Sequence, residues 1–112
     1  MSKIQTLLIE DNAVEAQKIK ESLEKNNFEI VAIASNLKEA LGLYYSENID
    51  IVIIDIFLNT KPDGITFAKI IVENKKTLKP FLFLTSAVSR VIFEDAKLTN
   101  PYSYLLKPYN EM

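Results

Sequence analysis

Short apolar runs rich in β-branched residues alternate along this chain with stretches in which apolar residues recur at helical spacing. The runs that predict strands are Ile4–Ile9, Phe28–Ala34, Asp50–Ile56, Phe81–Thr85 and Tyr102–Leu106. Strands and helices that alternate in this way predict an α/β fold, because right-handed crossovers make the strands parallel and place helices on both faces of the sheet. With five strands, the commoner doubly wound order is the flavodoxin-like 2-1-3-4-5.

The stretches between the strands carry amphipathic patterns. The first predicted helix begins near Ala13, and in the second the apolar residues fall at i, i+3, i+4 and i+7. Asp63 is predicted to cap the third helix, and Gly64 to permit the turn before it. The fourth helix, near Ser89–Leu98, has the weakest apolar stripe. These patterns complete a single domain over residues 1–112.

Composition excludes several kinds of chemistry. The 13 basic and 15 acidic residues give a formal charge of −2, so nothing favours direct nucleic-acid binding. The sequence contains no cysteine and no histidine, which excludes thiolate or imidazole catalysis, histidine-ligated metals and a phosphohistidine on this chain. No apolar run approaches the length of a membrane span, and the N-terminus lacks a signal-peptide pattern. We expect a cytoplasmic protein with no membrane partner.

Ionic or hydroxyl side chains stand at the carboxyl end of every central strand. They are Glu10 and Asp11 after the first strand, Asp55 in the third, Thr85 at the end of the fourth and Lys107 after the fifth. In a doubly wound sheet these strand ends meet at one edge, which is where such folds bind their ligands. The sequence therefore predicts a site at that edge.

The three carboxylates of this site predict a bound cation. Two such charges 4 Å apart repel by about 4 kcal/mol at an effective dielectric constant near 20. Oxygen ligands without histidine or thiolate favour Mg²⁺ or Ca²⁺, and a site with few carboxylates and open positions suits Mg²⁺, which accepts phosphate oxygens. Lys107 adds a positive charge and Thr85 a hydroxyl. Together these groups predict a pocket for a phosphoryl group, with a carboxylate as the attacking nucleophile.

The same residues resemble the signatures of response-regulator receiver domains, in order and at the expected spacing. The matching segments are Glu10-Asp11, Asp55-Ile-Phe-Leu followed by Asp63-Gly64-Ile65, Thr85-Ser86-Ala87, and Tyr104-Leu-Leu-Lys107-Pro108. The resemblance covers essentially the whole chain. It implies a phosphorylated switch rather than an enzyme.

The resemblance also implies a role for each matching residue. Asp55 would accept a phosphoryl group from a sensor histidine kinase or a phosphotransfer protein. Asp11 and Asp55 would bind Mg²⁺ directly, Glu10 would act through water, and the backbone carbonyl of Phe57 would complete the metal ligands. Lys107 would contact the phosphoryl group.

The resemblance also implies how the switch would work. Thr85 would contact the phosphoryl group, and Tyr104 would turn inward when Thr85 moves. The Lys107-Pro108 bond would be cis. A downstream effector domain or protein would read the change, and assembly into a homodimer stays open.

Two departures from the family pattern concern length. The loop from Asp55 to Asp63 is one residue longer than the commonest form, with Asn59 where many members have proline. The chain stops at Met112, where the family continues into a fifth helix. We therefore expect that helix to be missing or truncated, and apolar surface on the first, third and fifth strands to be partly uncovered.

Alternative interpretations remain for these residues. Asp11 could simply cap the first helix, Asp55 and Lys107 could form a structural salt bridge, and Thr85 and Tyr104 could be ordinary strand residues. A pseudo-receiver, which keeps the fold as a protein-interaction module without being phosphorylated, is the main alternative function. A phosphatase of the haloacid-dehalogenase type is disfavoured, because Phe57 occupies the place of its second aspartate.

Overall fold

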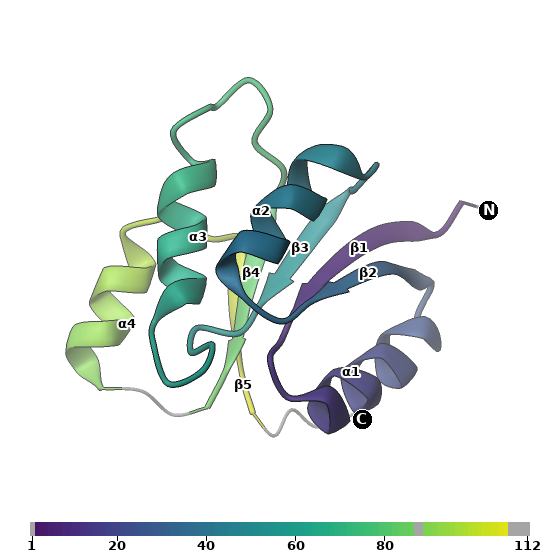
Figure 1. Cartoon of the computed structure of the whole chain (residues 1–112), viewed down its shortest axis with the longest axis horizontal. Helices are drawn as coiled ribbons and strands as arrows, with labels where there is room; N and C mark the ends of the chain where they lie inside the picture. The colour runs from purple at the N-terminus through teal and green to yellow at the C-terminus, as the bar shows by residue number, and fades with distance from the viewer. Residues whose placement is uncertain (1, 87–88, 108–112) are drawn as a thin grey trace.

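The computed structural model describes residues 2–86 and 89–107. Its elements, shown in Figure 1, are β1 (Ile4–Ile9), α1 (Ala13–Glu24), β2 (Phe28–Ala34), α2 (Leu37–Ser46), β3 (Ile51–Ile54), α3 (Asp63–Ile71), β4 (Phe81–Thr85), α4 (Arg90–Lys97) and β5 (Ser103–Leu106). The strands form one parallel sheet in the order β2-β1-β3-β4-β5. The predicted doubly wound α/β fold is confirmed.

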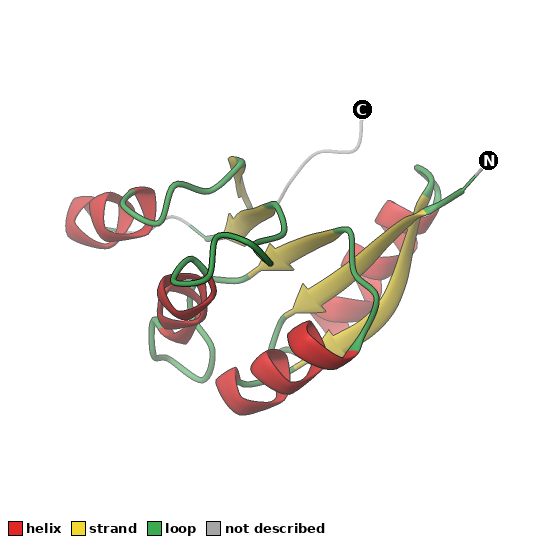
Figure 2. Cartoon of the chain, turned by 90° about the horizontal axis from the view of Figure 1, so that it is seen from above, coloured by secondary structure: helices red, strands yellow, loops and turns green. Residues whose placement is uncertain are grey.

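The two faces of the sheet carry cores of different size. α2, α3 and α4 cover one face, where Tyr44, Phe67 and Ala96 pack with residues of all the central strands. α1 lies on the other face (Figure 2), where Ile19 packs in a small cluster on Ile53 and its neighbours. The helices thus sandwich the sheet and leave the carboxyl ends of its strands facing outward.

The expectation of uncovered apolar surface is met in part. Leu8 on β1 and Ile53 on β3 are buried, whereas Ile4 on β1 is exposed. On β5, Leu105 lies on the face of α1 with Ile53 and Leu84 and is exposed, as expected. Within the described ranges α1 is the only helix on this face, and residues 108–112 lie outside them.

The structure differs from one predicted helix cap, at Asp63, and from one alternative interpretation, the cap at Asp11. Asn12 caps α1 by accepting a hydrogen bond from the Glu15 amide at 3.0 Å, so Asp11 is not the cap. Asp63 is the first residue of α3 and makes no side-chain cap, because Pro62 occupies the cap position. Asn100, which follows α4, has a φ of 59°, in the left-handed region that asparagine tolerates after a helix. The carboxylate of Asp11 is therefore not used by a helix terminus.

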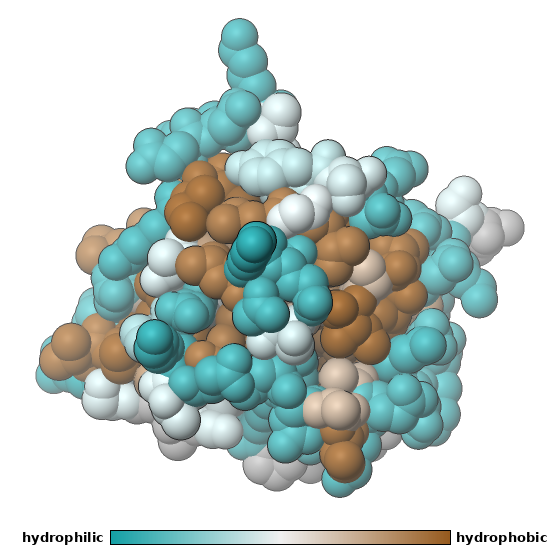
Figure 3. Space-filling model, viewed as in Figure 1, coloured by the Kyte–Doolittle hydropathy of each residue, from teal (hydrophilic) through white to brown (hydrophobic). Residues whose placement is uncertain are grey.

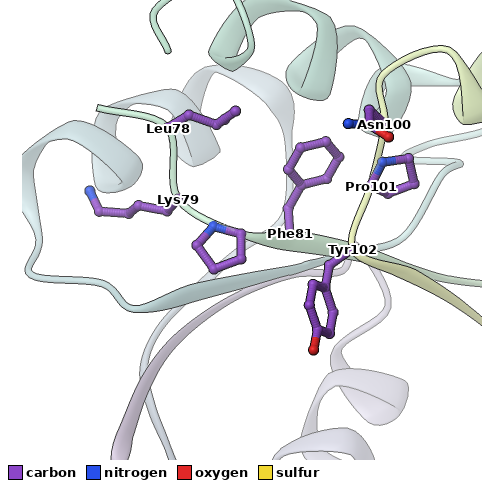
Figure 4. Close-up of a pocket in the computed structure, with 7 residues that line it drawn as sticks. Leu78, Lys79, Phe81, Asn100, Pro101 and Tyr102 are labelled. Carbon is purple, nitrogen blue, oxygen red and sulfur yellow. The ribbon is translucent and has the colours of Figure 1, made fainter. Parts of the chain in front are cut away.

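A hollow of about 410 Å³ opens at the amino ends of β4 and β5, away from the predicted site (Figure 4). Phe81 projects toward the side of Leu78 and Asn100, whereas Tyr102 points to the other side of the sheet. The residues that line the hollow include no carboxylate. Its composition does not fit the chemistry that the sequence predicts.

The outer surface of the molecule also has apolar parts. In the space-filling view, brown atoms lie at the edge formed by α4 (Figure 3), where Val91 and Leu98 are exposed. None of the helices in the described part of the chain combines the length and the apolar character that a bilayer crossing requires.

Candidate functional site

The carboxylates of Glu10, Asp11 and Asp55 come together at the carboxyl edge of the sheet. Each offers one oxygen, and these oxygens lie within 4.8 Å of one another. The ammonium of Lys107 joins them, with its Nζ 2.5 Å from Glu10 Oε1 and 3.1 Å from Asp55 Oδ2. The structure thus assembles four of the predicted site residues into one cluster.

Backbone hydrogen bonds fix the strand ends that carry this cluster. The Glu10 amide donates to Ala34 O at 2.9 Å, and the Asp55 amide donates to Ile9 O at 2.9 Å. The Lys107 amide donates to Thr85 O at 2.7 Å. Each functional residue thus follows its strand directly while remaining bonded to the neighbouring strand, which leaves the backbone of the site little freedom.

Gly64 brings α3 against the phosphoacceptor candidate. A Cβ at this position would lie 2.0 Å from the carbonyl oxygen of Asp55 and 2.9 Å from the Cα of Ile56. The Gly64 amide donates to Ile56 O at 2.9 Å. The glycine is therefore required by close backbone approach. This corrects the sequence-based explanation, which assigned it to a turn.

Every carboxylate of the cluster accepts a hydrogen bond from a backbone amide. Glu10 Oε2 accepts from Asn12 N at 3.0 Å, and Asp55 Oδ1 accepts from Phe57 N at 3.2 Å. In both pairs the donor lies two residues further along the chain. Asp11 Oδ2 instead accepts from the amide of Asn59 at 3.0 Å, 48 residues away. The loop after β3 is therefore part of the site.

Burial shifts the acid–base behaviour of this cluster. Burial raises the pKa of Glu10, although the hydrogen bonds from Lys107 and from the Asn12 amide oppose the shift. Burial also acts to lower the pKa of Lys107, but its hydrogen bonds to Glu10 and Asp55 outweigh that effect and raise the pKa. Lys107 is therefore a cation at neutral pH.

The formal charges leave the cluster negative. Three carboxylates and one ammonium sum to an excess of two negative charges, which a single divalent cation would balance. All the side-chain atoms of the cluster that could bind a metal are carboxylate oxygens, the ligands that Mg²⁺ prefers. The residues present therefore fit a magnesium ion.

Thr85 offers the site a buried hydroxyl. Its side chain is 2% exposed, and within the described ranges Oγ1 has no hydrogen-bond partner. Buried hydroxyls are rarely left unpaired, because each loses its hydrogen bonds to water on folding. A ligand oxygen at the edge of the sheet would satisfy it. This observation argues against an ordinary packing role.

The aromatic side chains of Tyr104 and Phe57 pack against the larger core. The Tyr104 ring lies 5.7 Å from that of Phe83 and 4.9 Å from that of Phe93, and its hydroxyl donates to Phe93 O at 3.4 Å. Phe57 is partly buried against the larger core. The predicted cis bond at Lys107-Pro108 lies outside the described residues, because Pro108 does.

Glu15 is a neighbour of the site that the sequence did not indicate. It sits in the first turn of α1, and its Oε1 lies 3.9 Å from Lys107 Nζ, with the side chain 40% exposed. Its position four residues after Asp11 is only a weak sign that it lies at the site. Whether the Glu15 carboxylate approaches Lys107 depends on which side of α1 faces the carboxyl edge of the sheet.

Comparisons with known proteins agree with this geometry. A family model of the response regulator receiver domain matches residues 6–112. The transcriptional regulatory protein PdtaR of Mycobacterium tuberculosis (strain CDC 1551 / Oshkosh) is 32% identical over 104 residues, which is 93% of this chain and 49% of PdtaR. The chain thus spans about half the length of the curated relatives it matches.

Solved structures show the same fold. The receiver domain of a modulated diguanylate cyclase from Desulfovibrio desulfuricans G20, described as an example of alternate folding, superposes with a TM-score of 0.85 at 28% identity, over 97% of this chain and 85% of that one. A two-component response regulator from Clostridium difficile gives a TM-score of 0.80 at 27% identity, over 96% and 86%. The chain belongs to the response regulator receiver domain family.

Proposed function

We propose that this chain is a phosphoacceptor receiver domain, in which Asp55 takes a phosphoryl group in a Mg²⁺-dependent reaction. The observation that carries the proposal is the cluster of three carboxylates and Lys107, together with the buried hydroxyl of Thr85 at the carboxyl end of β4, which has no partner among the described residues. A carboxylate nucleophile, a metal site, a cation and a hydroxyl donor are the parts that phosphoryl transfer to a side chain needs.

The metal would be held by the acidic residues. Asp11 and Asp55 would be direct ligands, with the Phe57 carbonyl, and Glu10 would act through water. When bound, Mg²⁺ supplies a positive charge that offsets the charge on the phosphoryl oxygens. Asp11 already has one oxygen held by the Asn59 amide, while the other is free of hydrogen bonds from described residues.

Asp55 would be the nucleophile. One of its oxygens forms a bond to phosphorus as the bond between phosphorus and the donor's imidazole nitrogen breaks, and that nitrogen keeps the electron pair. The Phe57 amide and Lys107 hold the two Asp55 oxygens and fix the direction of the carboxylate. Such fixed orientation is a large part of catalysis of phosphoryl transfer.

Lys107 and Thr85 would hold the transferred group. Lys107 would give up its contact with Asp55 and pair with a phosphoryl oxygen, and the Thr85 hydroxyl would donate to another. Movement of Thr85 would let the Tyr104 ring turn inward, which changes the surface near α4 and β5. A downstream effector domain or protein would read that surface.

The cellular setting follows from the family. The phosphoryl donor would be a sensor histidine kinase or a phosphotransfer protein in the cytoplasm, and the chain would act as a switch rather than as an enzyme. We expect no direct contact with nucleic acid or membrane, and association into a homodimer is compatible with the proposal.

Acetyl phosphate with Mg²⁺, followed by intact-mass measurement, tests the function. We expect a gain of one phosphoryl group in the parent protein and none in Asp55→Asn, or in the parent with excess chelator. Asp63→Asn is a matched control, because it removes a carboxylate nearby in sequence but outside the cluster. A parent protein that binds Mg²⁺ but gains no mass would identify a pseudo-receiver.

A further inference from the structure

The loop between β3 and α3 folds into a tight turn. Leu58 and Lys61 form an isolated antiparallel bridge, in which the Leu58 amide donates to Lys61 O at 2.8 Å and the Lys61 amide donates to Leu58 O at 3.2 Å. The two residues between them, Asn59 and Thr60, have φ values of 53° and 68°. Two successive positive φ values are characteristic of a type I′ turn.

The turn holds Thr60 in an unfavourable backbone conformation. Asparagine tolerates the left-handed region, but a β-branched residue rarely occupies it. Such strain persists only where the surrounding structure imposes it, and it concentrates at functional sites. Leu58, which is 1% exposed, anchors the turn in the larger core. The chain thus maintains a strained turn beside its acidic cluster.

The turn presents one backbone amide to the cluster. Asn59 N donates to Asp11 Oδ2 at 3.0 Å. Glu10 and Asp55 accept amides from their own segments, but Asp11 accepts none from a described residue of its own segment. Among the described residues the Asn59 amide is therefore the donor that fixes the Asp11 carboxylate.

We propose that the Leu58–Lys61 turn is a positioning device for the metal ligand Asp11. The Asn59 amide holds Oδ2 in place, which would leave Oδ1 available as a ligand for Mg²⁺. The proposal rests on the proposed function, since it concerns the metal of that site. Outer groups that orient a ligand typically change metal affinity by about 10- to 100-fold. The backbone amide carries this role, and the side chain of residue 59 does not.

Replacing one backbone amide by an ester tests the proposal in the full 112-residue chain, assembled by peptide ligation. An ester at residue 59 removes the N–H that bonds to Asp11, and it also weakens the Leu58 carbonyl as the acceptor of the Lys61 amide. We expect Mg²⁺ to bind about tenfold more weakly, measured by titration calorimetry on the unphosphorylated protein. The matched control is an ester at Lys61, which removes an N–H of the same turn that bonds to Leu58 O. It should leave the affinity within about twofold.

Asn59→Gly separates the side chain from the backbone. This variant keeps the amide and suits a positive φ, so Mg²⁺ affinity should match that of the parent. Thermal unfolding of each variant checks that it is folded. If both esters lost the same Mg²⁺ affinity, or if the ester at residue 59 lost none, the positioning role would be overturned. Failure of the parent itself to bind Mg²⁺ would instead overturn the metal site of the proposed function, and the positioning role with it.

Discussion

The two ends of the sheet differ in how their charged groups are satisfied. At the amino end, Lys79 lines the hollow, and its Nζ lies 4.7 Å from the centre of the Tyr44 ring and 3.5 Å from Tyr44 O. The Tyr44 hydroxyl donates to Thr77 O and accepts from the Lys79 amide. At the carboxyl end, three carboxylates share one ammonium, and the Thr85 hydroxyl lacks a described partner.

The difference separates a hollow from the proposed reactive site. The amino end has volume, but its Lys79 ammonium and Tyr44 hydroxyl already find partners within the protein. The carboxyl end has an excess of negative charge and an unpaired buried donor, which a bound ion and a phosphoryl group would satisfy. Unbalanced charge and a buried hydroxyl without a described partner therefore mark the carboxyl end as the proposed functional end of this molecule.

The largest expected effect comes from the close packing at the carboxyl end. In Gly64→Ala, a methyl group would lie 2.0 Å from the Asp55 carbonyl oxygen, and backbone must move to admit it. We expect a loss of about 3 kcal/mol or more in the free energy of unfolding, measured by urea denaturation, and slower phosphorylation of Asp55.

Gly42→Ala is the matched control for that change. Gly42 lies within α2, and an added Cβ would meet nothing within 4 Å. Removing a helical glycine should stabilise the protein by about 0.5–1 kcal/mol. A small effect of Gly64→Ala would show that α3 does not pack tightly against the Asp55 backbone.

A smaller effect is expected from removing a lysine at each end. Lys107→Met leaves Glu10 and Asp55 without their cation, and should lower the free energy of unfolding by about 2–3 kcal/mol at neutral pH. Burial already raises the pKa of Glu10, so this carboxyl binds a proton more readily in the folded protein than in the unfolded chain. Stability lost in the variant should therefore return as the pH falls, and also on addition of Mg²⁺.

Lys79→Met makes the same change of side chain at the amino end. It removes a cation over the Tyr44 ring and should lower the free energy of unfolding by about 0.5–1 kcal/mol. Mg²⁺ should have no influence on this loss. If Mg²⁺ restored the free energy of unfolding equally in both variants, or in neither, the contrast between the two ends would not hold.

Much of this contrast could be predicted from the sequence. The strand order places Glu10, Asp55 and Lys107 at one edge, because topology decides where strand ends meet and the side chains follow directly. The Asn59 amide could not be predicted, since a backbone donor leaves no trace in residue identity. The sequence predicts that a glycine is needed at position 64, but it does not predict the reason. The close approach of Gly64 to the Asp55 carbonyl depends on how α3 packs.

The smallest expected effect concerns Glu15, at the outer rim of the carboxyl end. Its carboxylate lies 3.9 Å from Lys107 Nζ and is 40% exposed, so Glu15→Gln should change the free energy of unfolding by less than about 0.5 kcal/mol. The rate of phosphorylation is more sensitive, because an anionic donor such as acetyl phosphate must approach Lys107 past this charge. We expect Glu15→Gln to raise that rate about two- to threefold at low salt.

Salt and a second glutamate on the same helix decide whether this effect is local. At 0.5 M NaCl the charges are screened within a few ångströms, so the gain in Glu15→Gln should largely disappear. Glu21→Gln makes the same change in net charge at an exposed position of α1 that pairs with Gln17 instead of Lys107. An equal gain in Glu21→Gln would mean that net charge alone controls the rate. A gain confined to Glu15→Gln would place Glu15 among the residues that tune access to the site.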